Sequence, residues 1–301
     1  MPLPLYYFLA NTAINVLMSW ALYLPYRVAH LHFITIANMA ISGYAAAWMV
    51  MSLHMPFGVA FLAGVALAGV IGYLVSLFIG DAPTFAVVIV GFAAIYITRT
   101  VIENLKAVGG TLGMFGLPAI AGSPAAHRWA IMAILAGLLL VVGFLIYRFD
   151  HGRLGRAASA AFVDKDLATS LGVDRAALGR LLQTFSCVIA GACGVLYAFI
   201  YRSLHLDFFT FHMVGVFMTV IFVGGYATQW GSVVLAPILY GVPLLFPPSV
   251  QAWRIVIYGA ALVLVLVLKP EGFITRRFVV SLERSLSVRR RRRNISEEEA
   301  V

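Results

Sequence analysis

The chain has 301 residues, of which 62% are hydrophobic and only 11% are charged. Soluble domains carry about 25% charged residues, so this composition excludes an ordinary soluble enzyme or binding module and indicates a polytopic membrane protein. The net charge of +9 does not predict a nucleic-acid partner, because most basic residues gather beside the apolar segments on one predicted side of the membrane. There they set the orientation and attract anionic membrane lipids.

Nine stretches are apolar enough to cross a bilayer, which takes about 20 residues. The sequence therefore predicts an all-α membrane protein, a helical bundle of about nine transmembrane helices. The seventh and eighth stretches are short and contain several glycines and prolines, a pattern typical of the broken helices that line cavities in transporters. The predicted spans are 5–25, 33–53, 57–79, 83–104, 129–149, 180–201, 211–227, 231–249 and 252–269.

The basic residues predict the orientation. If the polar segment 150–180 is cytoplasmic, 16 of the 21 Lys and Arg residues lie on or near the cytoplasmic side, as the positive-inside rule expects. The N-terminus is then outside and the C-terminus is cytoplasmic. We expect a transmembrane domain at 1–275 and a charged cytoplasmic tail at 276–301.

Two predicted spans carry small residues at every fourth position. In the third span these residues are Gly64, Ala68, Gly72 and Ser76, and in the sixth they are Ala190, Gly194 and Ala198. Small side chains on one helix face let two helices approach closely. These stripes predict helix packing rather than chemistry.

Residues 150–180 form the only long polar segment between hydrophobic spans. Asp164 is placed to cap a short helix that begins at Lys165, and Gly172 is placed to end it in the left-handed conformation. Asp174 can then cap the helix that runs into the next span. Five basic residues, Arg153 and Arg156 among them, accompany these caps.

The short helix in this segment carries a small apolar surface. Leu167 and Leu171 are four residues apart and share a face, with Ala168 beside them. Charged residues such as Asp166 flank this surface. The segment is either an ordinary cytoplasmic loop or a surface that docks into a groove on a partner protein.

Several predicted spans contain polar side chains, which either bond to neighbouring helices or line a solute pathway. Arg99 and Glu103 are four residues apart near the outer end of the fourth span. They form an ion pair on the helix face or take part in the pathway. The candidate pathway residues are Thr35, Asn38, Ser42, Thr98 and Glu103.

No set of residues in the sequence predicts catalysis. The glycine-rich stretch 109–118 (GGTLGMFGLP) is not followed by the GK[ST] of a phosphate-binding loop, and we expect it to fold tightly outside the membrane. Zinc-protease helices and cysteine clusters are also missing from the sequence. We therefore expect no enzyme activity, no metal site and no cofactor in this chain.

Three stretches resemble the membrane subunits of branched-chain amino-acid-type ABC importers, most closely the larger of the two paired permeases. Thr84–Pro118 is similar to a family span followed by a Gly-Gly…Gly-x-x-Gly-[Ile/Leu]-Pro outer loop. Gly152–Ala198 is similar to the family's coupling loop and the span after it. Val223–Phe273, with VGGYATQWG and LVLKPEGF, is similar to the family's Gly-Gly…Trp-Gly span and its closing [Lys/Arg]-Pro-Glu-Gly.

The resemblance assigns a role to the polar segment. Importer permeases of this type share a Glu-Ala-Ala-x-x-x-Gly motif that docks on the ATPase, and Asp166, Leu167, Ala168 and Gly172 occupy it here. Asp replaces Glu, and Leu replaces the first Ala, so the apolar surface is larger. The expected coupling residues are Arg153, Arg156, Asp164, Asp166, Leu167, Ala168, Leu171 and Gly172.

The resemblance implies the transmembrane subunit of an ATP-driven importer in the bacterial inner membrane. Its implied partners are two cytoplasmic ATPase subunits that bind the ATP, a homologous second permease subunit, a periplasmic or lipid-anchored solute-binding protein, and membrane lipids. The implied solutes are branched-chain amino acids, although urea, amides and other small solutes use similar permeases. The alternative is a secondary transporter or channel driven by an ion gradient, which would need an ionisable relay inside the membrane.

Overall fold

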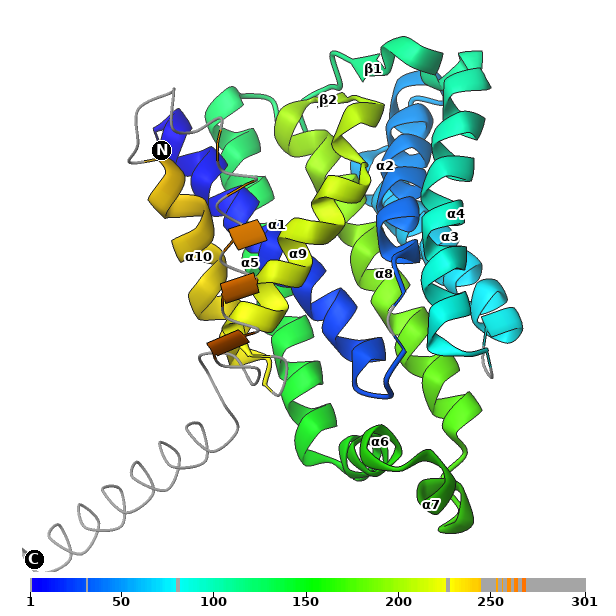
Figure 1. The fold of residues 1–301 in the computed structure, drawn as a ribbon. Coiled ribbons are helices and arrows are strands. Elements are labelled where there is room, and N and C mark those ends of the chain that lie inside the picture. The colour runs from blue at the N-terminus through cyan, green and yellow to red at the C-terminus, as the bar shows by residue number, and fades with distance from the viewer. Residues whose placement is uncertain are drawn as a thin grey trace, which may run out of the picture.

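The computed structural model describes residues 2–30, 32–79, 82–225 and 228–244, and single positions between 253 and 268. Within these residues the chain is a bundle of α-helices (Figure 1). In this described part of the chain, seven helices are long and apolar enough to cross a membrane, which confirms the prediction of an all-α polytopic membrane protein. The bounds of the first helices are α1 Leu3–Tyr26, α2 Ile34–Ser52, α3 Phe57–Ile79, α4 Thr84–Asn104 and α5 Pro124–His151. The next are α6 Arg153–Val163, α7 Lys165–Ser170, α8 Arg175–Tyr201, α9 Phe211–Gly224 and α10 Trp230–Leu244.

The first seven predicted spans correspond to α1 to α5, α8 and α9. α9 reaches the length of a span only together with the turn η3, Leu206–Phe208, that precedes it. α10 has 15 residues, which rise about 22 Å and fall short of the ~30 Å hydrocarbon core. The ninth predicted span lies outside the described residues except for single positions, and so do the tail 276–301 and the boundary at 275. The count of nine therefore stays a prediction.

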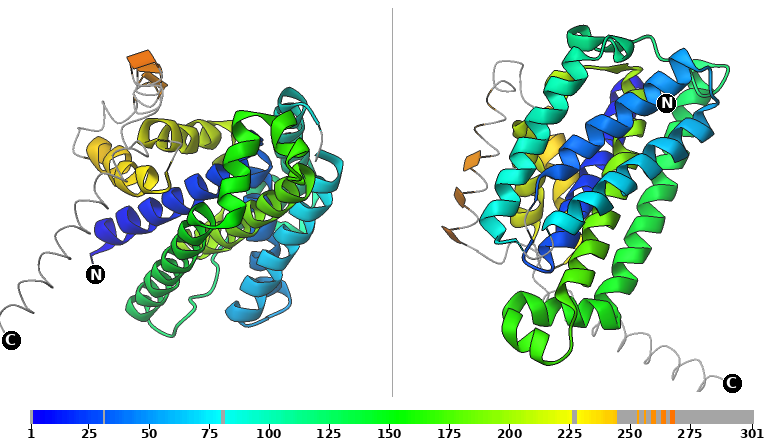
Figure 2. Two further views of the ribbon diagram at one scale, coloured as in Figure 1. Left: turned by 90° about the horizontal axis from the view of Figure 1, so that it is seen from below. Right: turned by 90° about the vertical axis from the view of Figure 1, so that its right-hand side faces the viewer.

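α8 occupies the centre of the bundle. It packs against α1, α2 and α3, and most of its surface is buried (Figures 1 and 2). α3, α4 and α5 instead expose large apolar side chains such as Phe78 (88% exposed), Phe85 (76%) and Leu140 (75%). A lipid environment accepts such surfaces without cost, because hydrocarbon tails are as apolar as these side chains.

The small-residue stripes lie where helices pack closely, with Gly64 of the α3 stripe against α8 and Gly194 of the α8 stripe against α2. A Cβ atom on Gly64 would lie 2.9 Å from the Val195 side chain, and one on Gly194 would lie 2.7 Å from Ser42 Oγ and still closer to the carbonyl oxygen of Met39. A larger side chain at either position would force the neighbouring helix or its side chains to shift. The predicted packing role of the stripes is confirmed.

The bundle has two distinct ends. α6 and α7 project from one end, and the two-residue strands β1 (Met114–Phe115) and β2 (Ser203–Leu204) lie at the other, where α1 also begins (Figure 1). We call these the elbow end and the strand end. The strands pair antiparallel, with Met114 opposite Leu204. The membrane side that each end faces stays a prediction.

The glycine-rich loop at the strand end folds tightly, as predicted. Gly109 has φ +86° and Gly113 has φ +84°. Glycine adopts positive φ readily because it has no Cβ atom. These two positions let the chain turn back toward β1 within a few residues of the end of α4.

Candidate functional site

The polar segment folds as its caps predict. Asp164 Oδ1 accepts hydrogen bonds of 3.0 Å from the backbone amides of Asp166 and Leu167, which begins α7. Gly172 has φ +83° after the helix ends. Asp174 Oδ1 accepts a 2.9 Å bond from the amide of Ala177 and begins α8. We call residues 150–174, which hold α6 and α7, the elbow.

The elbow presents apolar side chains to the outside of the bundle. Leu167 is 57% exposed and Leu171 is 73% exposed, whereas Ala168 is buried. Sequence reasoning missed Val163, an apolar residue just before the capping Asp164, which is 85% exposed. The structure brings all the expected coupling residues onto the elbow, and all but one are exposed: Arg153, Arg156, Asp164, Asp166, Leu167, Ala168, Leu171 and Gly172.

Polar contacts fix the elbow to the last turns of α1. Asp150, at the end of α5, accepts a 2.7 Å hydrogen bond from the Tyr23 hydroxyl and lies 3.4 Å from Arg27 Nε. Arg27 also donates to Ser159 Oγ on α6 at 2.9 Å. The Arg27 and Asp150 side chains are only 14% and 17% exposed, so the pair sits in a poorly solvated place. These contacts join the elbow to the end of α1.

The turn between α1 and α2 contacts the beginning of α8. Arg175 Nη2 lies 3.1 Å from His30 Nε2, and Gln183 Nε2 lies 3.4 Å from His32 Nδ1. Burial lowers the pKa of His32 to about 3, and neighbouring His30 acts in the same direction, so His32 is neutral at physiological pH. Among the described residues, no group of three or more His, Cys, Asp or Glu is placed to hold a metal ion.

The polar residues of α2 lie between helices. Thr35, Asn38 and Ser42 are fully buried. Ser42 Oγ lies 2.9 Å from the carbonyl oxygen of Gly191 on α8, and Asn38 Nδ2 lies 3.5 Å from that of Ala68 on α3. These contacts are the helix-to-helix bonds that polar groups make in membranes. A role in the pathway stays a prediction for them and for Thr98, which is half-buried on α4.

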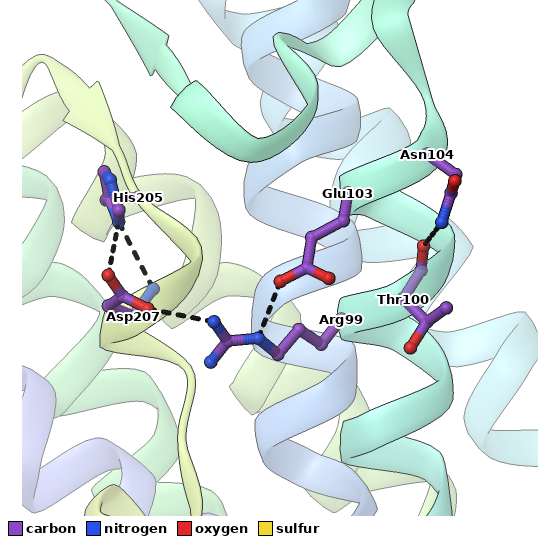
Figure 3. Close-up of polar contacts among 6 residues, drawn as sticks. All are labelled: Arg99, Thr100, Glu103, Asn104, His205 and Asp207. Atoms are coloured by element: carbon purple, nitrogen blue, oxygen red, sulfur yellow. Dashed lines mark hydrogen bonds and ion pairs between the residues drawn. The ribbon is translucent and has the colours of Figure 1, made fainter.

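Four charged or ionisable side chains join α4 to η3 at the strand end (Figure 3). Arg99 Nε lies 2.8 Å from Glu103 Oε1, which confirms the predicted ion pair. The same guanidinium reaches Asp207 Oδ1 at 3.1 Å, and His205 Nδ1 lies 3.2 Å from the other oxygen of Asp207. Sequence reasoning missed Asp207 because it is 108 residues away from Arg99. We call Arg99, Glu103, His205 and Asp207 the clasp.

A cavity of about 480 Å³ lies near the strand end. Its walls are the first half of α1, the end of α8, η3 and α9. The volume falls in the range of small-molecule sites. The described residues that line it include Tyr7, Asn11, Ile14, Asn15, Met39, Tyr197, Tyr201, Asp207, Phe208, Val216 and Phe217, and none of the predicted pathway residues.

Two asparagines on α1 supply polar groups to this cavity. Asn11 Nδ2 lies 2.7 Å from the Tyr201 hydroxyl. Asn15 is 2% exposed, and its Nδ2 donates to the Asn11 carbonyl at 2.7 Å. Its Oδ1 accepts no hydrogen bond from the described residues. Sequence reasoning passed over this pair, although two amides four residues apart in a predicted span were a signal for it.

Comparison with known proteins assigns the fold to a family. The family model described as the permease component of the branched-chain amino acid transport system matches residues 5–266. The chain belongs to this permease family. The permease is accordingly a multi-pass transporter component rather than a catalytic enzyme.

Two curated relatives carry the same description. The high-affinity branched-chain amino acid transport system permease protein LivM of Escherichia coli (strain K12) is 30% identical over 146 residues, which cover 48% of this chain and 34% of that protein. LivM of Salmonella typhimurium (strain LT2) is 29% identical over the same shares. The match thus spans about a third of the length of the curated relatives. No solved structure matches the chain.

Proposed function

We propose that the permease is the transmembrane subunit of an ATP-driven importer in the bacterial inner membrane. It forms the translocation path for branched-chain amino acids or related small polar solutes and binds a separate ATPase through the elbow. Two ATPase subunits hold the ATP, a homologous permease subunit completes the membrane part, and a periplasmic or lipid-anchored binding protein delivers the solute. The observation that carries the proposal is the exposed Leu167 and Leu171 on a capped helix outside the bundle.

The elbow has the properties of a docking element. Fully burying one leucine side chain in a partner stabilises a complex by about 1.5–3 kcal/mol, so Leu167 and Leu171 are suited to anchor it. The hydrogen bonds of Asp164 hold α7 in one conformation before binding, which lowers the entropy cost of association. The flanking charges of Arg153, Arg156 and Asp166 favour one orientation in the partner's groove.

The elbow is also placed to pass on the motion of an ATPase. It contacts α1 through Arg27, Asp150 and Ser159, and the first half of α1 lines the cavity. Closure of the ATPase dimer around ATP would displace the elbow, and α1 would move with it. This route links nucleotide binding at one end of the bundle to a solute at the other.

The test replaces the apolar surface of the elbow with charge. In the Leu167→Asp, Leu171→Asp double variant we expect loss of co-purifying ATPase subunits and at least a tenfold loss of ATP-dependent leucine uptake, while the protein stays in the membrane. Leu112→Asp is the matched control, because Leu112 is 75% exposed at the strand end. It should keep its ATPase. Unchanged ATPase binding in the double variant would contradict the proposal.

One observation bears on the gradient-driven alternative. The clasp is a set of ionisable groups, and secondary transporters use such groups as relays. Its members are all partly exposed at one end of the bundle, whereas a relay would have to extend through the interior. Leucine uptake that survives ATP depletion but collapses with the proton gradient would favour the alternative.

A further inference from the structure

We propose that the cavity between α1, α8 and α9 is where the permease binds the transported amino acid, and that Asn15 accepts a hydrogen bond from the amino acid's α-ammonium group. This inference rests on the proposed function and extends it by naming the site and the class of ligand. The ligand is a zwitterionic amino acid with an aliphatic side chain.

The carbonyl oxygen of Asn15 is the first reason. A buried acceptor without a partner is unfavourable, because it has given up its hydrogen bonds to water. The side-chain nitrogen of Asn15 already donates to the Asn11 carbonyl, which fixes the orientation of the amide. The oxygen that remains unpaired belongs to a residue that lines the cavity. An ammonium group carries three donors and no acceptor, so it matches this oxygen.

The apolar walls are the second reason. Ile14, Met39, Val216 and Phe217 line the cavity and are between 0% and 7% exposed. They can cover the aliphatic side chain of valine, leucine or isoleucine, and burial of its CH₂ and CH₃ groups favours binding. Urea and small amides could donate an N–H hydrogen bond to Asn15, but they have no aliphatic side chain to pack against these walls. The cavity therefore favours branched-chain amino acids over such solutes.

The rim of the cavity is the third reason. The rings of Tyr7, Tyr201 and Phe208 stack, with centroids 5.5 Å and 6.2 Å apart and planes within 14° and 18°. Phe208 belongs to η3, which the clasp holds through Arg99 and Asp207. The Asp207 carboxylate already contacts Arg99 and His205, so its role is to position this wall. The acceptor for the ammonium group is therefore Asn15.

The first test measures ATP-driven uptake of radiolabelled L-leucine by the complete transporter, reconstituted in proteoliposomes with its binding protein. Asn15→Leu removes the acceptor at similar volume, and we expect at least a tenfold loss of uptake while the ATPase subunits still co-purify. Asn104→Leu is the matched control, because Asn104 is exposed on α4 and does not line the cavity. Its uptake should stay within about twofold of the wild type.

A second measurement covers the case in which Asn15→Leu does not assemble. The chain has two cysteines, and both are buried, so a polar methanethiosulfonate reagent should leave them unmodified. Met213 lines the cavity, and we expect L-leucine to slow the labelling of Met213→Cys at least fivefold, with no effect of urea at the same concentration. Labelling of Leu112→Cys should not respond to either solute.

Each outcome decides the inference. Wild-type uptake in Asn15→Leu, or labelling of Met213→Cys that leucine does not slow, would contradict the proposed binding site. The proposed function would survive that result if the Leu167→Asp, Leu171→Asp variant still loses its ATPase. A wild-type complex that does not take up leucine with ATP would overturn the proposed function and the site together.

Discussion

The two ends of the bundle differ in which groups are exposed and which lack a hydrogen-bond partner. At the elbow, Asp164 and Asp174 satisfy the helix ends, while Leu167 and Leu171 remain exposed. At the cavity, the apolar walls are buried and the Asn15 carbonyl lacks a partner. An exposed apolar surface is stabilised when a protein partner covers it. A buried acceptor without a partner is stabilised when a small ligand donates a hydrogen bond to it. The difference suits one end to a protein and the other to a solute.

α1 belongs to both ends. Its first half carries Asn11 and Asn15 at the cavity, and its last turns carry Tyr23 and Arg27 at the elbow. If occupancy at one end changes the affinity at the other, the effect must be reciprocal. If α1 couples the two ends, binding of ATPase to the elbow should change the affinity of the cavity for leucine, and leucine should change the affinity for the ATPase by the same factor.

The largest expected effect comes from breaking the contact between α1 and the elbow. Removing one partner of a buried ion pair costs about 3–5 kcal/mol, and because Arg27 and Asp150 are slightly exposed, we expect about 3 kcal/mol for Asp150→Asn. The thermal unfolding midpoint in detergent should fall, and leucine-stimulated ATPase activity should be lost.

A double-mutant cycle distinguishes the interaction between Arg27 and Asp150 from the effect of each single substitution. Arg27→Met combined with Asp150→Asn leaves no unpaired charge and should recover most of the stability. It should not recover the stimulation of ATPase activity by leucine, because α1 and the elbow are then no longer joined. Full stimulation in the double variant would show that the signal takes another route.

The features that sequence predicted are local in the chain. The caps of Asp164 and Asp174, the left-handed Gly172 and the Arg99–Glu103 pair each depend on residues within four positions, and all were predicted and found. The length of the apolar stretches likewise predicted the seven spans that the described residues contain. Local spacing determines these features because neighbouring residues interact whatever the rest of the fold does.

The cavity and the clasp depend on tertiary packing instead. Asp207 contacts Arg99 across 108 residues of sequence, and Tyr201 contacts Asn11 across 190 residues. No local sequence pattern predicts either contact. The polar groups of α2 illustrate the same limit. Whether Asn38 and Ser42 face a pathway or a neighbouring helix depends on the rotation of α2 in the bundle, and spacing does not fix that rotation.

A smaller effect is expected from removing the cap of α7. Replacing a capping Asp by Ala costs about 1 kcal/mol, and a six-residue helix has few other interactions to hold it. Asp164→Ala should weaken ATPase binding about fivefold without changing leucine protection of the cavity. Asp174→Ala removes the same type of cap from the long helix α8, so ATPase binding should stay near wild type. Equal loss in both variants would show that the conformation of α7 is not what the ATPase requires.

The smallest effect is expected from opening the clasp. Exposed ion pairs contribute under about 1 kcal/mol, and Asp207 is 66% exposed, so Asp207→Asn should leave stability and ATPase binding unchanged. It should raise the KM for leucine about threefold, because η3 and its Phe208 would no longer be held against the cavity. Salt screens such pairs, so high ionic strength should move the wild type toward the variant. Glu103→Gln keeps the Arg99–Asp207 contact and should have a smaller effect. A variant that loses ATPase binding instead would mean that the two ends of the bundle are not separate in function.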